Sequence, residues 1–181
     1  MARLTPITEK DQLAPQDRAI GEAIGRSRGA IQGPFTMLLH SPQLAGRVAH
    51  LGAFVRFEGA LDMKVRVLAA MTVARELDAL YVWGAQTGGA RRLGVAESAI
   101  AAIREKGSKG LSPEEELVVQ ATRELLRRHR ISKAHWEKLL SRFGEEGVME
   151  LLGVIGYYSM LATVVNGCEL EASEGAEKLP V

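Results

Sequence analysis

The sequence predicts an all-α protein, a single-domain bundle of six to eight helices. Apolar residues recur at spacings of three and four along most of the chain, which is the period of an α-helix. Capping and stop signals separate these stretches, and no segment shows the two-residue alternation that is typical of a strand. The chain has 181 residues, of which 46% are hydrophobic, and this suits one domain with a substantial core.

The chain divides into three parts. Residues 1–14 are polar and are expected to form an N-terminal arm, the helical domain is expected over residues 15–171, and residues 172–181 follow as an acidic tail. The first helix is expected from Pro15 to Arg28, because two isoleucines lie four residues apart on one of its faces.

Glycines and a proline then break the helical pattern, and residues 35–40 are expected to form a short apolar turn. Ser41 caps a second helix, and Pro42 occupies its first position, where the missing N–H costs nothing. Apolar residues at the helical period continue this second helix to Val55.

A connector at residues 59–62 precedes two helices, which we expect over residues 63–75 and 77–93. Gly94 ends the second of them in the manner of a C-terminal glycine, and a short helix follows over residues 96–106.

The last third of the chain contains three further helices. Ser112 starts the first of them, with a proline after it and a glutamate three residues on, which is the pattern of a capping box. The other two are expected over residues 132–143 and 145–166, with Gly144 between them.

Charge and hydropathy exclude several classes of partner. The formal net charge is +1, so no concentrated basic face is expected for nucleic acid, and the basic run at residues 127–130 is interpreted as a helix C-terminus. The N-terminus lacks the apolar core of a signal sequence, and a single cysteine suits a reducing compartment, so we expect a cytoplasmic protein. Residues 148–165 form the most apolar stretch, but they include glycines and tyrosines and are short for a membrane span. A helix buried in the domain or in an oligomer interface is the preferred interpretation.

Residues 61–95, LDMKVRVLAAMTVARELDALYVWGAQTGGARRLGV, carry the most informative pattern. Tyr81 and Trp83 lie two apart, Gln86 follows three residues later, and an Ala-Arg-Arg triplet precedes Gly94. This pattern resembles the Tyr-x-Trp-x-x-His helix, followed by Ala-Arg and Gly, of the carboxymuconolactone decarboxylase and alkylhydroperoxidase D-like superfamily. The resemblance continues in GPFTMLLHSPQLAGRV, FVRFEGALDMKVR and GYYSMLATVVNGCELE, and so covers most of the chain. It implies an all-α fold and assembly into trimers or hexamers.

The peroxidase branch of this superfamily uses a CxxC pair, a histidine four residues beyond it and a glutamate twelve residues before it. The corresponding residues here are Ala79, Val82, Gln86 and Val67. None of them supplies a thiolate or titrates, so cysteine peroxidase activity at this site is not expected. Cys168 is interpreted as a lone structural thiol, because the sequence shows no activating neighbour.

The decarboxylase branch lacks the cysteine pair and resembles this chain better at Tyr81 and Trp83. The resemblance implies cofactor-free decarboxylation, or related lyase or isomerase chemistry, on a small carboxylated lactone or aromatic catabolite. Such chemistry needs donors or cations for the carboxylate and an acid for the carbon skeleton. Gln86 stands where the family has its histidine and cannot shuttle a proton. A non-catalytic protein that binds a ligand or a partner is therefore the alternative.

The candidate catalytic residues are Gln86 and His40, and for His40 the alternative is a hydrogen bond to a turn. The candidate substrate-binding residues are Tyr81, Trp83, Arg66, Arg75 and Tyr158.

Several of these residues have a structural alternative. The aromatic pair could belong to the core, and the two arginines could form surface ion pairs with Asp62 and Asp78. The small residues around Gln86 could leave room for a ligand or allow close helix packing. No metal site is expected, because the four histidines show no helical pair with metal-binding spacing.

Overall fold

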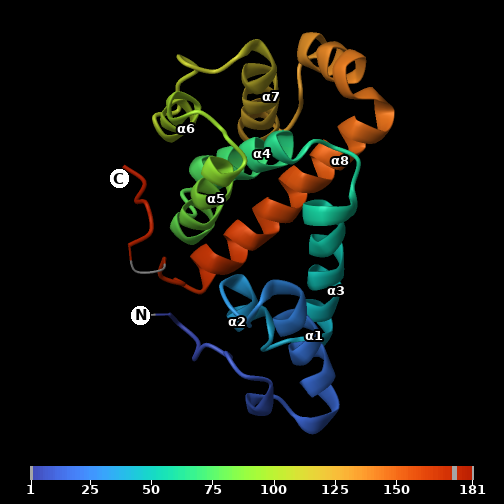
Figure 1. Cartoon of the computed structure of the whole chain (residues 1–181), viewed down its shortest axis with the longest axis vertical. Helices are drawn as coiled ribbons and strands as arrows, with labels where there is room; N and C mark the ends of the chain where they lie inside the picture. The colour runs from blue at the N-terminus through green and yellow to red at the C-terminus, as the bar shows by residue number, and fades with distance from the viewer. Residues whose placement is uncertain (1, 173–174, 181) are drawn as a thin grey trace.

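The computed structural model describes residues 2–172 and 175–180, and within them every regular element is helical. This confirms the predicted all-α class, and the eight α-helices lie within the predicted range (Figure 1). Two 3-10 turns precede them, and a π-helical turn follows α3. In chain order the elements are η1 (Lys10–Gln12), η2 (Pro15–Asp17), α1 (Arg18–Arg28), α2 (Pro34–Leu38), α3 (Pro42–Ala53), η3 (Phe54–Glu58), α4 (Met63–Glu76), α5 (Leu80–Arg92), α6 (Glu97–Arg104), α7 (Pro113–Arg128) and α8 (Lys133–Gly167).

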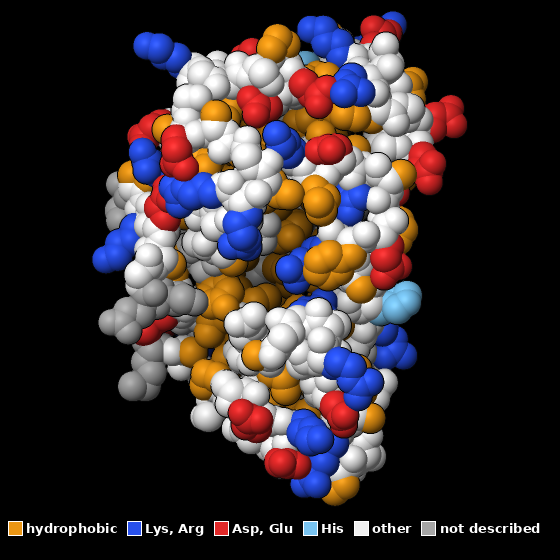
Figure 2. Space-filling model, viewed as in Figure 1, with side chains coloured by type: hydrophobic (Ala, Val, Ile, Leu, Met, Phe, Trp, Pro, Cys, Tyr) orange, Lys and Arg blue, Asp and Glu red, His pale blue; other side chains and the backbone are white. Residues whose placement is uncertain are grey.

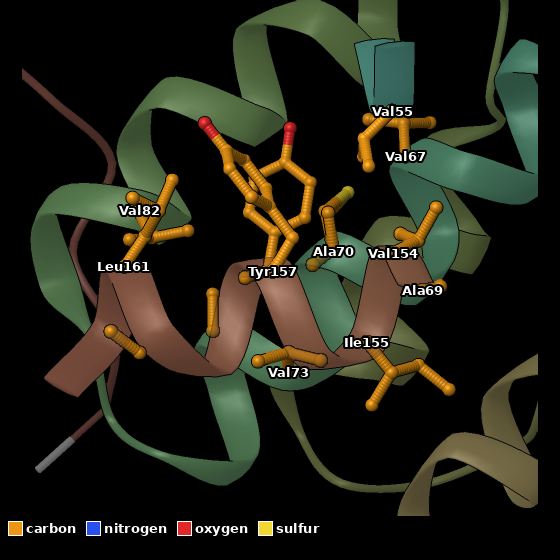
Figure 3. Packing of buried hydrophobic residues seen from close by; sticks show 14 of the residues in the cluster. Val55, Val67, Ala69, Ala70, Val73, Val82, Val154, Ile155, Tyr157 and Leu161 are labelled. Atoms are coloured by element: carbon orange, nitrogen blue, oxygen red, sulfur yellow. The ribbon is translucent and has the colours of Figure 1, made fainter. Parts of the chain in front are cut away.

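Helix α4 lies at the centre of the bundle, in contact with α5, α7 and α8 (Figure 1). Every residue from Val65 to Ala74 is buried, so this helix is enclosed around its whole circumference. In Figure 3, Val73 of α4 and Ile155 of α8 lie among the side chains that pack between these two helices. The enclosed helix fixes the positions of α5 and α8, which carry most of the candidate site.

Helix α8 bends at Gly144, whose backbone is non-helical, with φ 68° and ψ 179°. The sequence predicted a break at this residue, because only glycine reaches such a conformation without steric cost. Among the described residues, α8 is also the one helix that is long and apolar enough to cross a membrane by length and composition. Half of its most apolar stretch is buried within the chain, as is usual for the core helix of a soluble protein.

Three local features differ from the sequence prediction. Residues 34–38 form the short helix α2 in place of a turn, because Pro34 starts the helix and the hydroxyl of Thr36 donates to the carbonyl of Gly33 (2.8 Å). Helix α3 continues into the π-helical turn η3. Helix α5 begins at Leu80, three residues later than expected, because Asp78 interrupts the helix with a positive φ of 47°.

The ends of the chain pack against the bundle. Leu13 of the predicted arm and Leu179 of the predicted tail are both buried. The carboxylate of Glu177 pairs with Arg91 (2.6 Å) and Arg104 (3.3 Å), which attaches the tail to α5 and α6. Residue 1 of the predicted arm and residues 173, 174 and 181 of the predicted tail lie outside the described part of the chain.

Candidate active site

A cavity of about 330 Å³ lies where the end of α1, the start of α2, η3, α5 and the C-terminal half of α8 meet. The face shown in Figure 2 is hollowed in the region between α2, α3 and α8, with hydrophobic side chains at depth and Lys or Arg at the edge. Aromatic and aliphatic side chains form most of the cavity wall, as is usual for small-molecule sites. Among the described residues, its polar side chains are Arg28, Gln32, Arg56, Tyr81, Gln86, Tyr157 and Tyr158, and none of its lining residues is acidic.

Gln86 and Tyr158 meet inside this cavity. Gln86 projects from α5 and Tyr158 from α8, where its side chain is buried. Burial raises the pKa of the Tyr158 hydroxyl to about 12, and the positive charge of Arg56 and, to a smaller extent, hydrogen bonding with the Gln86 side chain oppose this shift. At neutral pH the site therefore presents a protonated phenol that can donate a hydrogen bond to a ligand.

Arg28 and Tyr157 form a second polar group of the same cavity. Arg28 is the last residue of α1, and its guanidinium lies 4.1 Å from the centre of the Phe35 ring, in a cation–π contact. Burial lowers the pKa of Arg28 and the neighbouring Tyr157 opposes this, whereas burial raises the pKa of Tyr157. In Figure 3 the ring of Tyr157 rises from the same side of α8 on which Val82 lies. The site thus carries a half-buried positive charge beside a neutral hydroxyl.

Arg56 supplies the other positive charge of the cavity. It lies on the π-helical turn η3, and its exposed guanidinium is 4.8 Å from the centre of the Phe57 ring. A π-helical turn adds one residue to the helical ladder, so the residues around it project in new directions, and such turns are frequent at functional sites. Here the turn directs Arg56 to the rim of the cavity.

Three of the candidate residues, Gln86, Tyr81 and Tyr158, line this cavity together. Trp83 lies elsewhere, because its side chain has no solvent exposure and packs in the core. His40 is exposed, and its imidazole hydrogen-bonds the carbonyl of Thr5 (2.9 Å) at the N-terminal arm. The structure therefore separates His40 from the cavity, whose described lining residues do not include it.

Arg66 and Arg75 also lie away from the cavity. Arg66 is buried, and its guanidinium donates to the carbonyls of Val55 (3.3 Å), Gly59 and Leu61 (2.5 Å). Its guanidinium holds backbone carbonyls, and the carboxylate of Asp62, the ion-pair partner considered from the sequence, accepts from the N–H of Lys64 instead.

The side chain of Arg75 pairs with Asp78, which agrees with the structural alternative considered from the sequence. It also donates to the carbonyl of Arg104 (2.6 Å), and so joins the end of α4 to α6.

Three of the four positions that carry chemistry in the peroxidase branch hold apolar side chains, and the fourth is Gln86 in the cavity. Ala79, Val82 and Val67 are all buried in the hydrophobic core. Cys168 is a free, partly exposed cysteine at the end of α8. Within residues 2–172 and 175–180, no three His, Cys, Asp or Glu side chains gather where they could hold a metal ion.

The small residues of α5 serve both of the purposes considered from the sequence. Ala85 lines the cavity beside Gln86. A side chain at Gly84 would lie 2.8 Å from Ala176, so this glycine allows the C-terminal tail to approach closely. One side of the helix thus makes room for a ligand and another side makes room for the tail.

Sequence reasoning missed Arg28, Arg56, Phe35 and Tyr157 as members of the cavity. Arg28 ends a helix that is more than 50 positions away from Gln86 along the chain, and no local pattern links the two. The adjacent tyrosines in α8 were a usable signal, from which one is expected to face inward and the other outward; that expectation was wrong, because both are buried and line the cavity.

A second, larger hollow of about 690 Å³ lies between the N-terminal ends of α4 and α7 and the bend of α8. Several of its polar groups are already engaged. Arg142 pairs with Glu114, Asp62 caps α4, and Ser112 and Glu115 form a capping box. The smaller cavity is the better candidate site, because its guanidiniums lack acidic partners and its tyrosines and glutamine converge.

Several solved structures resemble the chain over almost its whole length. An uncharacterised peroxidase-related protein from Ralstonia eutropha JMP134, with an alkylhydroperoxidase AhpD core, has a TM-score of 0.80 at 14% identity, over 96% of this chain and 93% of that one. An uncharacterised peroxidase-related protein from Silicibacter sp. TM1040 has a TM-score of 0.76 at 13% identity, over 97% and 93% of the two chains. An alanine variant of the debrominase Bmp8, in complex with 2,3,4-tribromopyrrole, has a TM-score of 0.75 at 18% identity, over 96% and 95%. The protein is thus an all-α protein with the alkylhydroperoxidase D-like fold.

The sequence model of the carboxymuconolactone decarboxylase family matches residues 42–124, from the start of α3 to within α7. No curated protein matches the chain. Residues 42–124 are thus similar to the carboxymuconolactone decarboxylase family, within a chain that has the alkylhydroperoxidase D-like fold. Gln86 and Arg56 lie inside the matched stretch, whereas Arg28, Tyr157 and Tyr158 lie outside it.

Proposed function

We propose that this protein is a cofactor-free carboxy-lyase, or a related lyase or isomerase, that acts on a small carboxylated lactone or aromatic catabolite. The observation that carries the proposal is the charge of the cavity. Arg28 and Arg56 line it with no acidic side chain among the other lining residues, so the site attracts an anion. The volume of about 330 Å³ suits a small molecule, and the aromatic wall suits a ring.

The proposed reaction divides the work between the guanidiniums and the neutral donors. A guanidinium holds a substrate carboxylate through charge-assisted hydrogen bonds. When the scissile carbon–carbon bond breaks and carbon dioxide leaves, the electron pair passes to the conjugated carbonyl of the substrate. The hydroxyl of Tyr158 and the amide of Gln86 are placed to donate hydrogen bonds to that developing oxyanion. The reaction is completed when a water molecule transfers a proton to the carbon that has lost carbon dioxide.

Turnover of carboxymuconolactone tests this proposal directly. We expect the unaltered protein to consume it and Tyr158→Phe to do so about 100-fold more slowly, the usual effect of removing one oxyanion donor. Arg47→Gln is a suitable control, because Arg47 is exposed and bonds only within its own helix. Absence of turnover of carboxymuconolactone and of related lactone acids would contradict the enzymatic proposal.

A non-catalytic role in ligand binding is the second candidate. The observation in its favour is that, among the described residues, no histidine, cysteine, lysine, aspartate or glutamate lines the cavity, so the usual side chains for general acid–base catalysis are missing there. In that case carboxylated ligands bind to the cavity but leave unchanged. Equilibrium binding of carboxymuconolactone without product formation would favour this candidate over the enzyme.

We also propose that the protein self-associates as a trimer or hexamer, with a second copy on an apolar face beside the candidate site. Leu51 and Phe54 of α3 and η3 are exposed next to Met149 of α8, around a mostly apolar groove of about 310 Å³. Exposed apolar side chains that cluster in this way are typical of protein–protein interfaces. Sedimentation equilibrium is the test, and a mass equal to one chain would contradict the proposal.

A further inference from the structure

The guanidinium of Arg28 is a half-buried positive charge without a carboxylate partner in the described part of the chain. Its Nη1 lies 2.6 Å from the hydroxyl oxygen of Ser27, its Nη2 donates to the carbonyl of Ala49 (3.1 Å), and its face covers Phe35. Its Nε is buried and has no hydrogen-bond partner. A buried charge or polar group costs free energy unless it is paired, so this arrangement favours a ligand that brings an anion.

The surroundings of Arg28 are built to hold it in place. A Cβ atom at Gly52 would lie 2.1 Å from the hydroxyl oxygen of Tyr157 and 3.1 Å from Nη2 of Arg28. Only glycine at this position therefore lets Arg28 and Tyr157 approach each other against α3. The planar guanidinium, fixed against an aromatic ring and a carbonyl, loses little freedom when a ligand binds.

Arg56 differs from Arg28 in each of these respects. It is exposed on η3, where its guanidinium lies against the ring of Phe57. An exposed charge that can move attracts anions from solution, but water screens it and it fixes no orientation. The two arginines therefore differ in function at the same cavity: Arg28 can orient a bound anion, whereas Arg56 can only attract one.

We propose that Arg28, assisted by the hydroxyl of Tyr157, is the specificity-determining residue that anchors the carboxylate of the ligand. Arg56 supplies only attraction at the rim. The carboxylate lies against Arg28 on the α1 side of the cavity, and the rest of the ligand extends along the aromatic wall towards Gln86 and Tyr158. The inference rests on the proposed function in taking the ligand to be a small carboxylate. Since α1 lies outside the stretch that matches the family, this anchor is a feature of this chain beyond the matched domain.

Benzoate and benzamide provide a matched pair of probes, because they share one shape and differ in charge. The Nε–H resonance of Arg28 is followed by NMR in the full-length protein while each probe is added, and it is assigned by its loss in Arg28→Gln. We expect benzoate to move this resonance at millimolar concentration and benzamide to leave it unchanged. Failure of benzoate to move it would overturn the proposal, whatever the behaviour of any variant.

Single-residue variants distinguish specific binding of the carboxylate by Arg28 from a general attraction between positive charge and the anion. We expect Arg28→Gln to weaken benzoate binding at least about tenfold and Arg56→Gln to weaken it by less. We also expect the affinity for benzoate to depend more strongly on salt in the unaltered protein than in Arg56→Gln. Arg47→Gln, with the same change of charge on an exposed face, is the control. Equal losses in Arg28→Gln and Arg47→Gln would overturn the proposal.

Binding and turnover fail independently. Benzoate binding at Arg28 without turnover of carboxymuconolactone removes the enzymatic proposal and retains the anchor. Turnover with the same KM in Arg28→Gln and in the unaltered protein would contradict the proposal that Arg28 anchors the carboxylate, but it would support the enzymatic proposal. If Arg28→Gln does not fold, Arg28→Lys, which also lacks the Nε–H group, supplies the assignment, and the titration of the unaltered protein decides.

Discussion

Arg66 and Glu150 hold the same connector from two sides, one through its carbonyls and the other through its N–H groups. The guanidinium of Arg66 donates to the carbonyls of Gly59 and Leu61, whereas the carboxylate of Glu150 accepts from the N–H of Ala60 (2.9 Å) and Leu61 (2.7 Å). The connector directly follows η3, the turn that brings an arginine to the cavity rim. Two charged side chains outside the cavity therefore position one of its walls.

Replacing Arg66 with leucine should destabilise the protein by roughly 3 kcal/mol, because buried carbonyls lose charged hydrogen bonds and no water replaces them. Urea unfolding measures the change. Arg47→Leu is the control and should stay within about 0.5 kcal/mol, since Arg47 is exposed. A loss for Arg66→Leu as small as that of the control would show that the connector does not depend on this residue.

Gln86 and Tyr158 should be energetically coupled. Both side chains line the same cavity, and the interaction with Gln86 lowers the pKa of the Tyr158 hydroxyl; a side-chain hydrogen bond contributes about 1 kcal/mol. In a double-mutant cycle of Gln86→Ala and Tyr158→Phe, measured by urea unfolding, we expect the losses of the two single variants to exceed that of the double variant by about this amount. Strictly additive losses would mean that the two side chains act independently.

Glu124 should make the stability of the protein depend on pH in the acid range. Its carboxylate accepts from the N–H of Ser132 (2.9 Å) and lies 3.0 Å from His135, and these contacts lower its pKa from 4.5 to about 2. Because the folded-state pKa is depressed, the stabilisation is complete above the ordinary pKa and is lost as the pH falls from about 4.5 through 2.

The variant Glu124→Gln imitates the protonated state and provides the measurement. The unaltered protein should be more stable than the variant at pH 7, and the difference should shrink as the pH is lowered through this window. A difference that stays constant from neutral pH to pH 3 would contradict the assignment, since it would arise from packing and not from charge.

The fold could be predicted from the sequence because its signals are local. The break at Gly144, the capping box that opens at Ser112 and the stop before Gly94 each depend on residues only a few positions apart, and all three are found in the structure. The errors were local too. The interruption at Asp78 uses a left-handed conformation that aspartate adopts seldom, and no neighbouring residue announces it.

The candidate site could be predicted only in part because it is assembled by the tertiary fold. Gln86, Tyr81 and Tyr158 follow from helices whose inner faces the pattern indicates, and these three residues do share one cavity. Which arginines line the cavity could not be predicted from the local sequence pattern. Arg66 lies close to the motif in sequence but is turned towards backbone carbonyls, whereas Arg28 reaches the cavity only because α1 packs beside α3.

Cys168→Ser should leave the behaviour of the protein towards hydroperoxides unchanged. The positions of the paired cysteines in the peroxidase branch are held here by Ala79 and Val82, which are buried and apolar. A single thiol at the end of α8 has no second cysteine to resolve an oxidised intermediate. We expect no catalytic consumption of an alkyl hydroperoxide by either protein. Consumption that disappears in Cys168→Ser would assign the activity to this thiol and contradict the prediction.

Two glycines of α5 should respond in opposite ways to the same substitution. Glycine inside a helix is less favourable than alanine by about 1 kcal/mol, so Gly88→Ala should raise the free energy of unfolding by nearly that amount. At Gly88 the added methyl group would meet only the flexible end of Arg92, 3.5 Å away. At Gly84 it would lie 2.8 Å from the Cβ of Ala176, within the tail that Glu177 attaches to the bundle.

The tail must therefore move in Gly84→Ala, and the gain from helix propensity should be cancelled or reversed. Urea unfolding of the two variants, with hydrogen exchange of residues 175–180, measures both effects. We expect faster exchange in the tail of Gly84→Ala only. Equal gains in stability with an unchanged tail would mean that the contact between α5 and the tail contributes nothing to the folded state.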